Sequence, residues 1–287
     1  MKISVDLVKA FTKDKEQGSP AGVTHNADQL SDEQMLKIAG ILGYSESAFI
    51  QKSDKADFRV RFFAVKEEVD FCGHATIATF YSLVKHDRIT FDGKRVATVT
   101  QETKAGVFPV TCHSDGKIMM SQENPQYMDI ETDRKLVAKL LGITESDFGQ
   151  TPIQIVSTVY PMMVIPVKSL AVLKQIKPSF EALSQYSSNH KSVGFSVFTT
   201  ESGENNVDFA TRFFNPLLGI NEDPATGVAA GSLGGYADKY VFNGKQKQMV
   251  IRQGFDMGKP STIEVDLSNG VEVGGYAASF GQKEFTI

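Results

Sequence analysis

Hydrophobic and polar residues follow two periods along this chain, one typical of helices and the other of strands. Residues 31–42 place apolar side chains at helical spacing behind Ser31 and Gln34, which predicts a capped helix that stops at Gly43. A second helical pattern runs from Thr132 to Gly142. The segments that favour strands are residues 3–10, 95–103, 106–112, 117–122, 153–158, 162–167, 249–253, 262–266, 271–273 and 280–287. This mixture of many strands and fewer helices predicts an α+β fold.

A stretch in the first half of the chain recurs in the second half at one fixed offset. The tripeptide Arg61–Phe63 returns as Arg212–Phe214 after 151 residues. The same 151 residues separate Cys72, at the start of one predicted helix, from Asp223, just before another. Agreement at both points indicates that the chain repeats itself.

The repeat also extends upstream of these tripeptides. Phe49 matches Phe198 if the turn between the two strands is two residues longer in the second half, and hairpin turns tolerate insertions. Each half then consists of a strand, a turn, a second strand, a loop and a helix. This order predicts two lobes related by pseudo-twofold symmetry.

The repeat sets the expected domain boundaries. We expect an N-terminal lobe over residues 1–123, joined by the last strand at about residues 277–287, and a C-terminal lobe over residues 124–276. The turn-forming residues from Asn124 to about Glu131 are expected to form the crossover between them. If the lobes face each other, two helix N-termini meet at one cleft. Their backbone N–H groups and dipoles would favour an anion such as a substrate carboxylate.

Composition and charge exclude several classes of function. The 287 residues are 41% hydrophobic with a net charge of −4, which is ordinary for a globular protein. The basic residues are dispersed, so we expect no nucleic-acid partner, and no segment reaches the roughly 18 apolar residues that a membrane helix needs. The two cysteines, Cys72 and Cys112, lack CxxC spacing, which argues against a disulfide framework or a cysteine-based zinc site and favours a cytoplasmic location.

Three ionisable residues are candidates for chemistry. Glu46 begins a hairpin strand and is either an ordinary surface acid or, if buried in the cleft, a general acid or base. His74 lies at a helix N-terminus, where the dipole disfavours the imidazolium form. Asp223 is expected at the N-cap of the corresponding helix, a role worth about 1 kcal/mol and compatible with catalysis. Cys112 and His113 are adjacent on a predicted strand and point to opposite faces, so we expect no site there.

Four segments together resemble the PhzF-like family of phenazine biosynthesis, within the diaminopimelate-epimerase-like group. They occur in the family's order across nearly the whole chain, as Ser45–Phe49, Cys72–Thr76, Glu222–Gly227 and Val273–Gly275. The resemblance implies two similar lobes, each a curled mixed β-sheet around a central helix, with the site between them. It also implies a homodimer that uses no cofactor and no metal ion.

The resemblance implies roles for individual residues. Glu46 would be the acid/base that shuttles the proton, with His74 and Asp223 as polar partners that orient substrate and proton. The backbone at Gly73 and Gly227 would hold the substrate carboxylate.

Three positions bear on the substrate and on the mechanism. Val228 stands where well-known members place a serine that contacts substrate, and Ser19 replaces a usual asparagine, so both are expected to contact the ligand. In the wider group a pair of cysteines exchanges the proton. Here Cys72 has Asp223 as its counterpart, so racemisation by two thiols is not expected.

We therefore predict a cofactor-independent isomerase or epimerase that moves a proton on a small carboxylate-bearing metabolite, by acid/base catalysis between the two lobes. The alternative is a catalytically silent protein of the same fold that binds a small molecule, which the residues at Ser19 and Val228 would favour. A metal-dependent hydrolase is a third reading, weakened because the sequence has no HExxH pattern.

Overall fold

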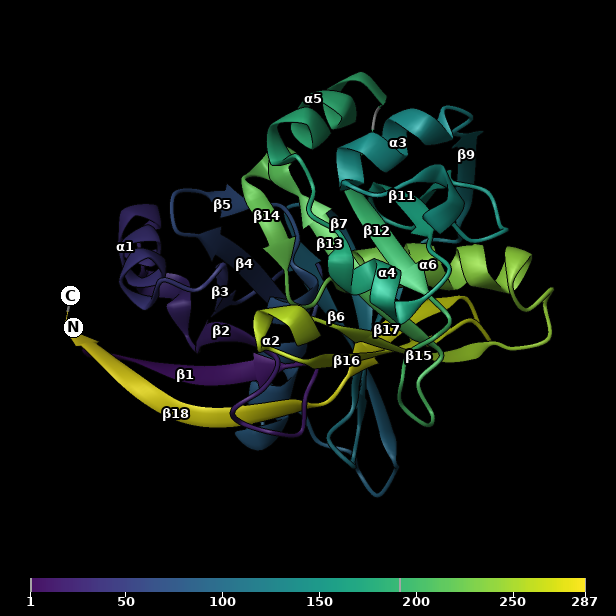
Figure 1. Cartoon of the computed structure of the whole chain (residues 1–287). Coiled ribbons are helices and arrows are strands. Elements are labelled where there is room, and N and C mark those ends of the chain that lie inside the picture. The colour runs from purple at the N-terminus through teal and green to yellow at the C-terminus, as the bar shows by residue number, and fades with distance from the viewer. Residues whose placement is uncertain (1, 191, 287) are drawn as a thin grey trace. The chain divides into compact units, whose positions relative to one another are not determined.

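The structure is a computed structural model that describes residues 2–190 and 192–286. The chain forms two compact units (Figure 1). Unit 1 runs as far as Ser121 and takes in the residues from Gly274 onward, while unit 2 is the continuous segment Gln122–Val273. Both units combine many strands with fewer helices, so the predicted α+β fold class is confirmed.

Unit 1 is built on a mixed sheet. Its strands are β1 (Lys2–Ala10), β2 (Ser19–Thr24), β3 (Glu46–Gln51), β4 (Phe58–Ala64), β5 (Glu68–Val69), β6 (Val96–Thr103), β7 (Gly106–His113), β8 (Ile118–Gln122) and β18 (Ala277–Thr286). Its helices are the 3-10 turn η1 (Ala27–Gln29), α1 (Asp32–Leu42) and α2 (Gly73–Lys85). Strand β1 pairs antiparallel with both β18 and β2, and the pairs β2–β3 and β4–β6 are parallel. The strands β3 and β4, and then β6, β7 and β8, pair antiparallel.

Unit 2 is also built on a mixed sheet. Its strands are β9 (Gln126–Ile130), β10 (Gln154–Ser157), β11 (Pro161–Pro166), β12 (Gly194–Thr199), β13 (Phe209–Asn215), β14 (Ile220–Asp223), β15 (Gln248–Gln253) and β16 (Ser261–Asp266), followed by β17 (Val271–Gly275). Its helices are α3 (Arg134–Leu141), α4 (Leu170–Gln175), α5 (Phe180–His190) and α6 (Gly227–Tyr240), with 3-10 turns η2 (Glu145–Asp147), η3 (Pro216–Leu218) and η4 (Phe255–Met257). The pairs β11–β12 and β13–β15 are parallel, and β9–β10, β10–β11, β12–β13 and β15–β16 are antiparallel.

The two sheets share one strand order. Unit 1 reads β18-β1-β2-β3-β4-β6-β7, and unit 2 reads β9-β10-β11-β12-β13-β15-β16, with the parallel pairs at the same two places. Helix α2 follows β5 and helix α6 follows β14, each a short strand paired with the Arg-Phe-Phe strand of its unit. The repeat in the sequence is therefore a repeat of topology.

The two repeated arginines make the same contacts in their own units. In unit 1, Nε and Nη2 of Arg61 donate hydrogen bonds of 2.8 and 2.9 Å to the two carboxylate oxygens of Glu68. In unit 2, Nε and Nη2 of Arg212 donate bonds of 2.9 and 2.8 Å to Glu222. Each guanidinium carbon also lies 5.1 or 5.0 Å from the ring centre of the last phenylalanine of its own tripeptide. The repeated tripeptides thus reflect repeated side-chain chemistry.

The register differs from the prediction by one residue. Arg61 pairs with Phe49 in unit 1, but Arg212 pairs with Val197, so the expected match of Phe49 with Phe198 is wrong. The connection is three residues longer in unit 2 and not two. Every residue of β12 is buried, so its sequence lacks the alternation of apolar and polar positions that would fix a register.

The crossover expected from Asn124 to about Glu131 is also partly wrong, because residues Gln126–Ile130 form strand β9. All five residues of β9 are exposed, and the strand exists because its backbone pairs antiparallel with β10. A strand without a buried face leaves no hydrophobic alternation in the sequence.

Helices α2 and α6 are the central helices of their units. Ten of the thirteen residues of α2 and eleven of the fourteen of α6 are buried, as is typical of a helix surrounded by its own core. The glycines of α6 allow this close packing: a Cβ at Gly234 would lie 2.6 Å from Val265, and one at Gly235 would lie 2.4 Å from Pro125. These contacts explain why glycine is tolerated inside a helix, where it costs about 1 kcal/mol.

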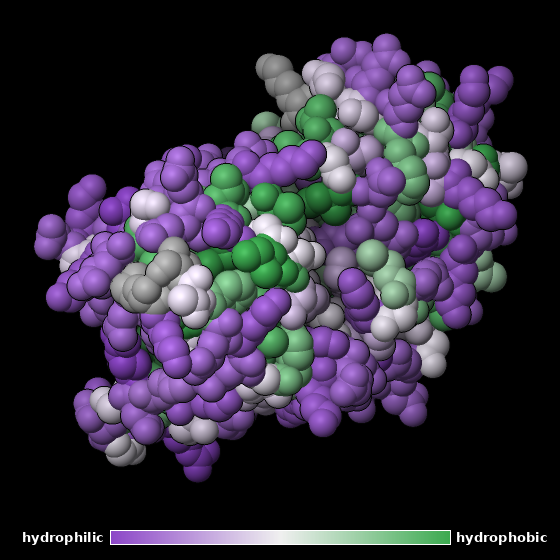
Figure 2. Space-filling view, turned by 90° about the vertical axis from the view of Figure 1, so that its left-hand side faces the viewer, coloured by the Kyte–Doolittle hydropathy of each residue, from purple (hydrophilic) through white to green (hydrophobic). Residues whose placement is uncertain are grey.

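The surface shows scattered hydrophobic residues. Hydrophilic residues cover most of the face shown in Figure 2, with hydrophobic ones between them. The exposed large hydrophobic side chains include Ile41, Val65 and Leu218. In the part of the chain that the structure describes, no helix is long and apolar enough to cross a membrane.

Candidate active site

Helix α2 of unit 1 begins without help from the side chain that precedes it. Cys72 is the N-cap residue, and among the described residues its side chain makes no capping hydrogen bond, whereas Ser31 and Gln34 form a capping box at helix α1. A helix N-terminus without a side-chain cap can offer its first N–H groups, at Gly73 and His74, and the positive end of its dipole to an anion. This is the arrangement that the sequence predicts for a carboxylate.

Glu46 and His74 meet at this helix start. Glu46 is the first residue of β3, where it pairs with Ala64 of β4, and His74 lies in the first turn of α2. Nε2 of His74 lies 3.4 Å from Oε2 of Glu46, and the two side chains are only 6% and 14% exposed. Two groups that can carry a proton therefore lie in contact and largely out of water, as acid/base chemistry requires.

Two further side chains approach the His74 ring. Oγ of Ser45 lies 3.4 Å from Nε2 of His74, so this nitrogen faces both Ser45 and Glu46. Sγ of Cys72 lies 3.5 Å from Nδ1 and 3.9 Å from Nε2 of the same ring. Three side chains thus contact the ring and restrict its orientation. Ser45 belongs to a segment that the sequence analysis singled out, but its contact with His74 depends on the fold.

Ser19 begins strand β2 at the same end of the sheet at which Glu46 begins β3. These two strands are parallel and paired, so both start at that end. The Ser19 side chain is buried, and its Oγ finds no hydrogen-bond partner within residues 2–190 and 192–286. A buried hydroxyl without a partner costs about 1–3 kcal/mol, so a ligand that supplied one would gain from it.

In unit 2, Asp223 does not occupy the N-cap position predicted from the sequence. It ends strand β14, and the N-cap residue of α6 is Thr226, whose side chain makes no capping hydrogen bond among the described residues. Oδ2 of Asp223 accepts a hydrogen bond of 2.6 Å from Oγ1 of Thr226, and Oδ1 accepts one of 3.4 Å from the backbone N–H of Ala225. The residues Pro224 and Ala225 lengthen the loop, so the carboxylate shapes the turn before the helix.

Gln253 of β15, which no pattern in the sequence marks, holds this turn. Its Nε2 donates hydrogen bonds to the backbone carbonyl of Asp223 at 2.7 Å and to Oγ1 of Thr226 at 3.0 Å, and its Oε1 accepts one from the Thr226 N–H at 3.3 Å. Gln253 is 2% exposed, and a buried amide with three hydrogen bonds fixes its partners. No local motif marks it, because its partners lie on a different element.

Gly227 and Val228 form the first turn of α6. Both are buried, and the carbonyl of Gly227 accepts a hydrogen bond of 3.2 Å from Nε2 of Gln122. Val228 supplies methyl groups at the second position of the helix, where a serine would supply a hydroxyl. This turn can therefore offer backbone N–H groups to a ligand, but its side chain at residue 228 offers only apolar contact.

The two cysteines of the chain lie in different chemical environments. One oxygen, sulfur or nitrogen atom from each of Glu46, Cys72 and His74 lies within 4.8 Å of the others, so these residues could hold a metal ion. Burial raises the pKa of the Cys112 thiol to about 12 and leaves it protonated at neutral pH. Cys112 is therefore a core residue and not a reactive thiol.

Comparisons with known proteins give the family. The family described as phenazine biosynthesis-like protein matches residues 8–282. Among curated proteins, an uncharacterized isomerase, YfhB, from Bacillus subtilis is 36% identical over 93% of this chain and 90% of its own length. The trans-2,3-dihydro-3-hydroxyanthranilate isomerase of Pseudomonas aeruginosa is 28% identical over 96% of both chains.

The fold agrees with these sequence relationships. A crystal structure of the phenazine biosynthesis protein of the PhzF family from Bacillus anthracis matches with a TM-score of 0.89 and 30% identity, over 100% of both chains. The resemblance drawn from the four sequence segments is thus confirmed. The chain belongs to the phenazine biosynthesis-like family, and it is an enzyme of the isomerase class.

Proposed function

We propose that this enzyme is a cofactor-independent isomerase that moves a proton between two positions of a small carboxylate-bearing metabolite. One observation carries the proposal: Glu46 and His74 are in contact at 3.4 Å and shielded from water, at a helix N-terminus that lacks a side-chain cap. A carboxylate that faces a substrate here can accept a proton from carbon, and the helix start can hold the anionic end of the same molecule.

The proposed reaction has two proton transfers and no net change in composition. Glu46 accepts a proton from a substrate carbon, and the electron pair of the broken C–H bond moves into the adjoining unsaturated system. His74 orients the Glu46 carboxylate through Nε2, and the backbone N–H groups at Gly73 and His74 stabilise the negative charge. Glu46 then returns the proton to a different carbon, or to the other face of the same one.

Unit 2 by itself offers a second set of groups that could bind a ligand. Asp223 would orient a polar group of the substrate, held in place by Thr226 and Gln253. The N–H groups at Gly227 and Val228 would bind an anionic or carbonyl oxygen, while the Val228 methyl groups would favour an apolar neighbour. The apolar Val228 and the unpartnered Ser19 hydroxyl favour a substrate that differs from that of the relative named for dihydrohydroxyanthranilate.

The experiment is proton exchange in deuterated water with a panel of small carboxylates, followed by NMR and mass spectrometry. The Glu46→Gln variant keeps the shape of the side chain but cannot accept a proton, so we expect exchange and turnover to fall by about 10²–10⁴-fold. Glu33→Gln, at an exposed position of α1, is the matched control and should retain full activity. If Glu46→Gln retained turnover within about tenfold of the native enzyme, Glu46 would not be the acid/base.

A second candidate is a protein that binds such a metabolite without turning it over, which the apolar Val228 favours. The same exchange measurement decides between the two. Deuterium that enters a bound ligand rules out binding alone, and binding without exchange across the panel would overturn the isomerase mechanism for those ligands. The homodimer implied by the family resemblance stays a prediction, and analytical ultracentrifugation would test it.

A further inference from the structure

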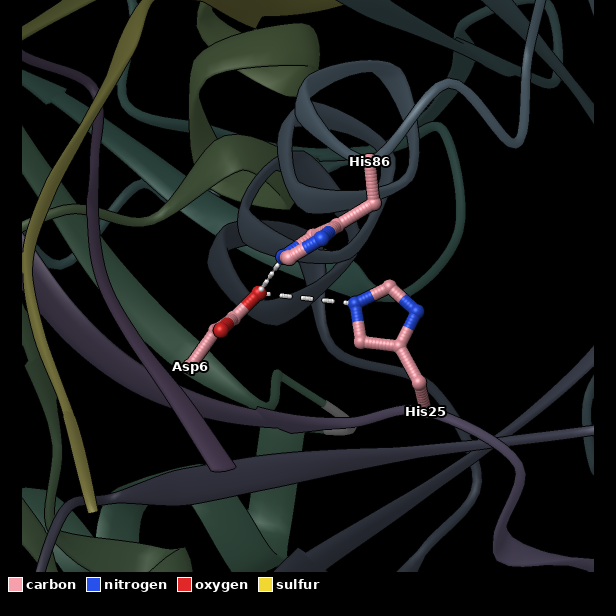
Figure 3. A group of neighbouring side chains, drawn as sticks. All are labelled: Asp6, His25 and His86. Atoms are coloured by element: carbon pink, nitrogen blue, oxygen red, sulfur yellow. Dashed lines mark hydrogen bonds and ion pairs between the residues drawn. The ribbon is translucent and has the colours of Figure 1, made fainter. Parts of the chain in front are cut away.

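Three side chains that the proposed mechanism does not use converge within unit 1. Asp6 projects from β1, His25 directly follows β2, and His86 follows the last residue of α2. Figure 3 shows both imidazole rings turned toward the Asp6 carboxylate, each joined to it by a dashed line. One ligand atom from each residue lies within 4.8 Å of the others. Three elements far apart in sequence therefore deliver two imidazoles and one carboxylate to the same place.

The distances are close to those of a coordinated ion. Nε2 of His25 lies 3.5 Å and Nε2 of His86 lies 2.7 Å from the same atom, Oδ2 of Asp6. Around a tetrahedral Zn²⁺ with bonds of about 2.0–2.2 Å, ligand atoms lie roughly 3.3 Å apart. The His25 distance already fits, although Nε2 of His25 also lies 2.8 Å from Oγ of Ser82, and a bound ion would replace that contact. The His86 ring would need to move back by roughly 0.6 Å to make room. Its side chain is 40% exposed, so it has space to do so.

The Asp6 carboxylate is held in place by neighbours that are not ligands. Nε2 of Gln282 donates a 2.7 Å hydrogen bond to Oδ1, and Oγ of Ser82 donates a 2.5 Å hydrogen bond to Oδ2. The Asp6 side chain is 4% exposed. Metal sites commonly have such supporting hydrogen bonds, which orient the ligating carboxylate. A carboxylate fixed in this way presents Oδ2 toward the two histidines.

A helix dipole next to the group suits a cation. The C-terminus of α2, next to His86, carries the negative end of the helix dipole.

An ion can reach the group from solvent. A cavity of about 530 Å³ is lined by residues that include Asp6, His25 and His86. Two cationic residues, Lys2 and Arg88, also line the cavity, and the Arg88 guanidinium donates a 3.3 Å hydrogen bond to Oδ1 of Asn26 and not to the Asp6 carboxylate. The cavity leaves room for water or a small ligand to complete the coordination of a bound ion.

We propose that Asp6, His25 and His86 form a binding site for one divalent transition-metal ion, of which Zn²⁺ is the probe. Imidazole nitrogens with a carboxylate oxygen select such ions over Mg²⁺ and Ca²⁺, which prefer ligand sets made entirely of oxygen. The site is separate from the proposed catalytic pair: His86 follows the C-terminus of α2, while His74 lies in the first turn of the same helix.

The test is titration of the untagged, full-length, chelator-treated protein with Zn²⁺ by calorimetry, with Co²⁺ as a spectroscopic probe. We expect one ion per chain in the native protein, and visible absorption of bound Co²⁺ typical of low coordination. His25→Gln and His86→Gln should each weaken binding by at least about tenfold. Circular dichroism would verify that each variant is folded, and Zn²⁺ should raise the melting temperature of the native protein more than that of either variant.

Two control variants make the assignment specific. His190→Gln, in unit 2, removes a histidine outside the group and should leave Zn²⁺ binding unchanged. Cys72→Ser should also leave it unchanged, since it alters the other possible ligand group, formed with Glu46 and His74. If Cys72→Ser lost binding while His25→Gln kept it, the ion would be bound by the group that contains Cys72, and the proposal would be overturned. Equal binding by the native protein and both ligand variants, or no stoichiometric binding at all, would do the same.

Discussion

The buried arginine of unit 2 allows a sharp test of how the repeated motif stabilises the fold. We consider Arg212→Met, which preserves much of the apolar stem but removes the guanidinium. Arg212 is 9% exposed, and besides its two bonds to Glu222 its Nη1 donates to the backbone carbonyls of Leu173 and Ile176 at 3.2 and 3.0 Å. The substitution therefore leaves a carboxylate and two carbonyl groups without these donors.

The magnitude follows from what is left behind. Breaking a buried ion pair by removing one partner costs about 3–5 kcal/mol, because the remaining charge stays largely shielded from water. Arg61→Met is the matched variant of unit 1. Arg61 also binds a carboxylate with two bonds, but its further partner, Asp32, has a side chain that is 76% exposed and can return to water. We therefore expect Arg212→Met to lower the free energy of unfolding by about 1–2 kcal/mol more than Arg61→Met does.

The assay is equilibrium unfolding in urea followed by far-UV circular dichroism, because the chain has no tryptophan. The two units could unfold in separate transitions, and each should then be fitted by itself. Arg212→Lys keeps the charge but cannot form the paired bonds, so its stability should lie between those of the native protein and Arg212→Met. An Arg212→Met protein within about 1 kcal/mol of the native one, or no less stable than Arg61→Met, would refute this reasoning.

Two further predictions concern unit 1. Gly274→Ala should destabilise the protein by about 1–3 kcal/mol, because the new Cβ would lie 1.9 Å from the backbone carbonyl oxygen of Ile118. Gly40 lies at an exposed position of α1, and a new Cβ there would find no atom closer than 3.8 Å. Gly40→Ala should therefore stabilise the protein by about 0.5–1 kcal/mol. Urea unfolding of both variants would measure the two effects. Hydrogen bonds from Arg61 lower the pKa of Glu68 below 4.5. The ionised Glu68 therefore contributes its full stabilisation of the protein above that pH, and this contribution is lost as the pH falls through the pKa of the folded state. The free energy of unfolding of native protein minus that of Glu68→Gln should therefore be constant near neutral pH and shrink in acid; a difference that grows in acid would contradict this sign.

Much of the fold could be predicted because local patterns and tertiary structure agree. The two Arg-Phe-Phe strands were detectable because the same arginine-carboxylate contact is built twice, although the glutamate follows its arginine by 7 residues in unit 1 and by 10 in unit 2. Strand β9 could not be predicted, because it is defined by backbone pairing with β10 and has no buried face. The register of β12 was missed for the opposite reason, since all its residues are buried.

The same distinction applies to the candidate site. Glu46 and His74 could be singled out from their places at the start of a strand and of a helix. Gln253 and the group around Asp6 could not, since each depends on contacts between elements that are distant in sequence. Asp223 was identified as a candidate but assigned the wrong local role, because the two residues after it extend the loop before α6 begins.

The pairing of β1 with β18 determines when the units can be completed during synthesis. Lys2 lies opposite Thr286, so β1 cannot complete this pairing until β18 has been synthesised. Unit 2 is encoded without interruption between these strands and can finish folding while β1 still presents an open edge. A nascent chain stalled before Ala277 should therefore hold a finished second unit beside an incomplete first one, which a chaperone that recognises unpaired strands would be expected to protect.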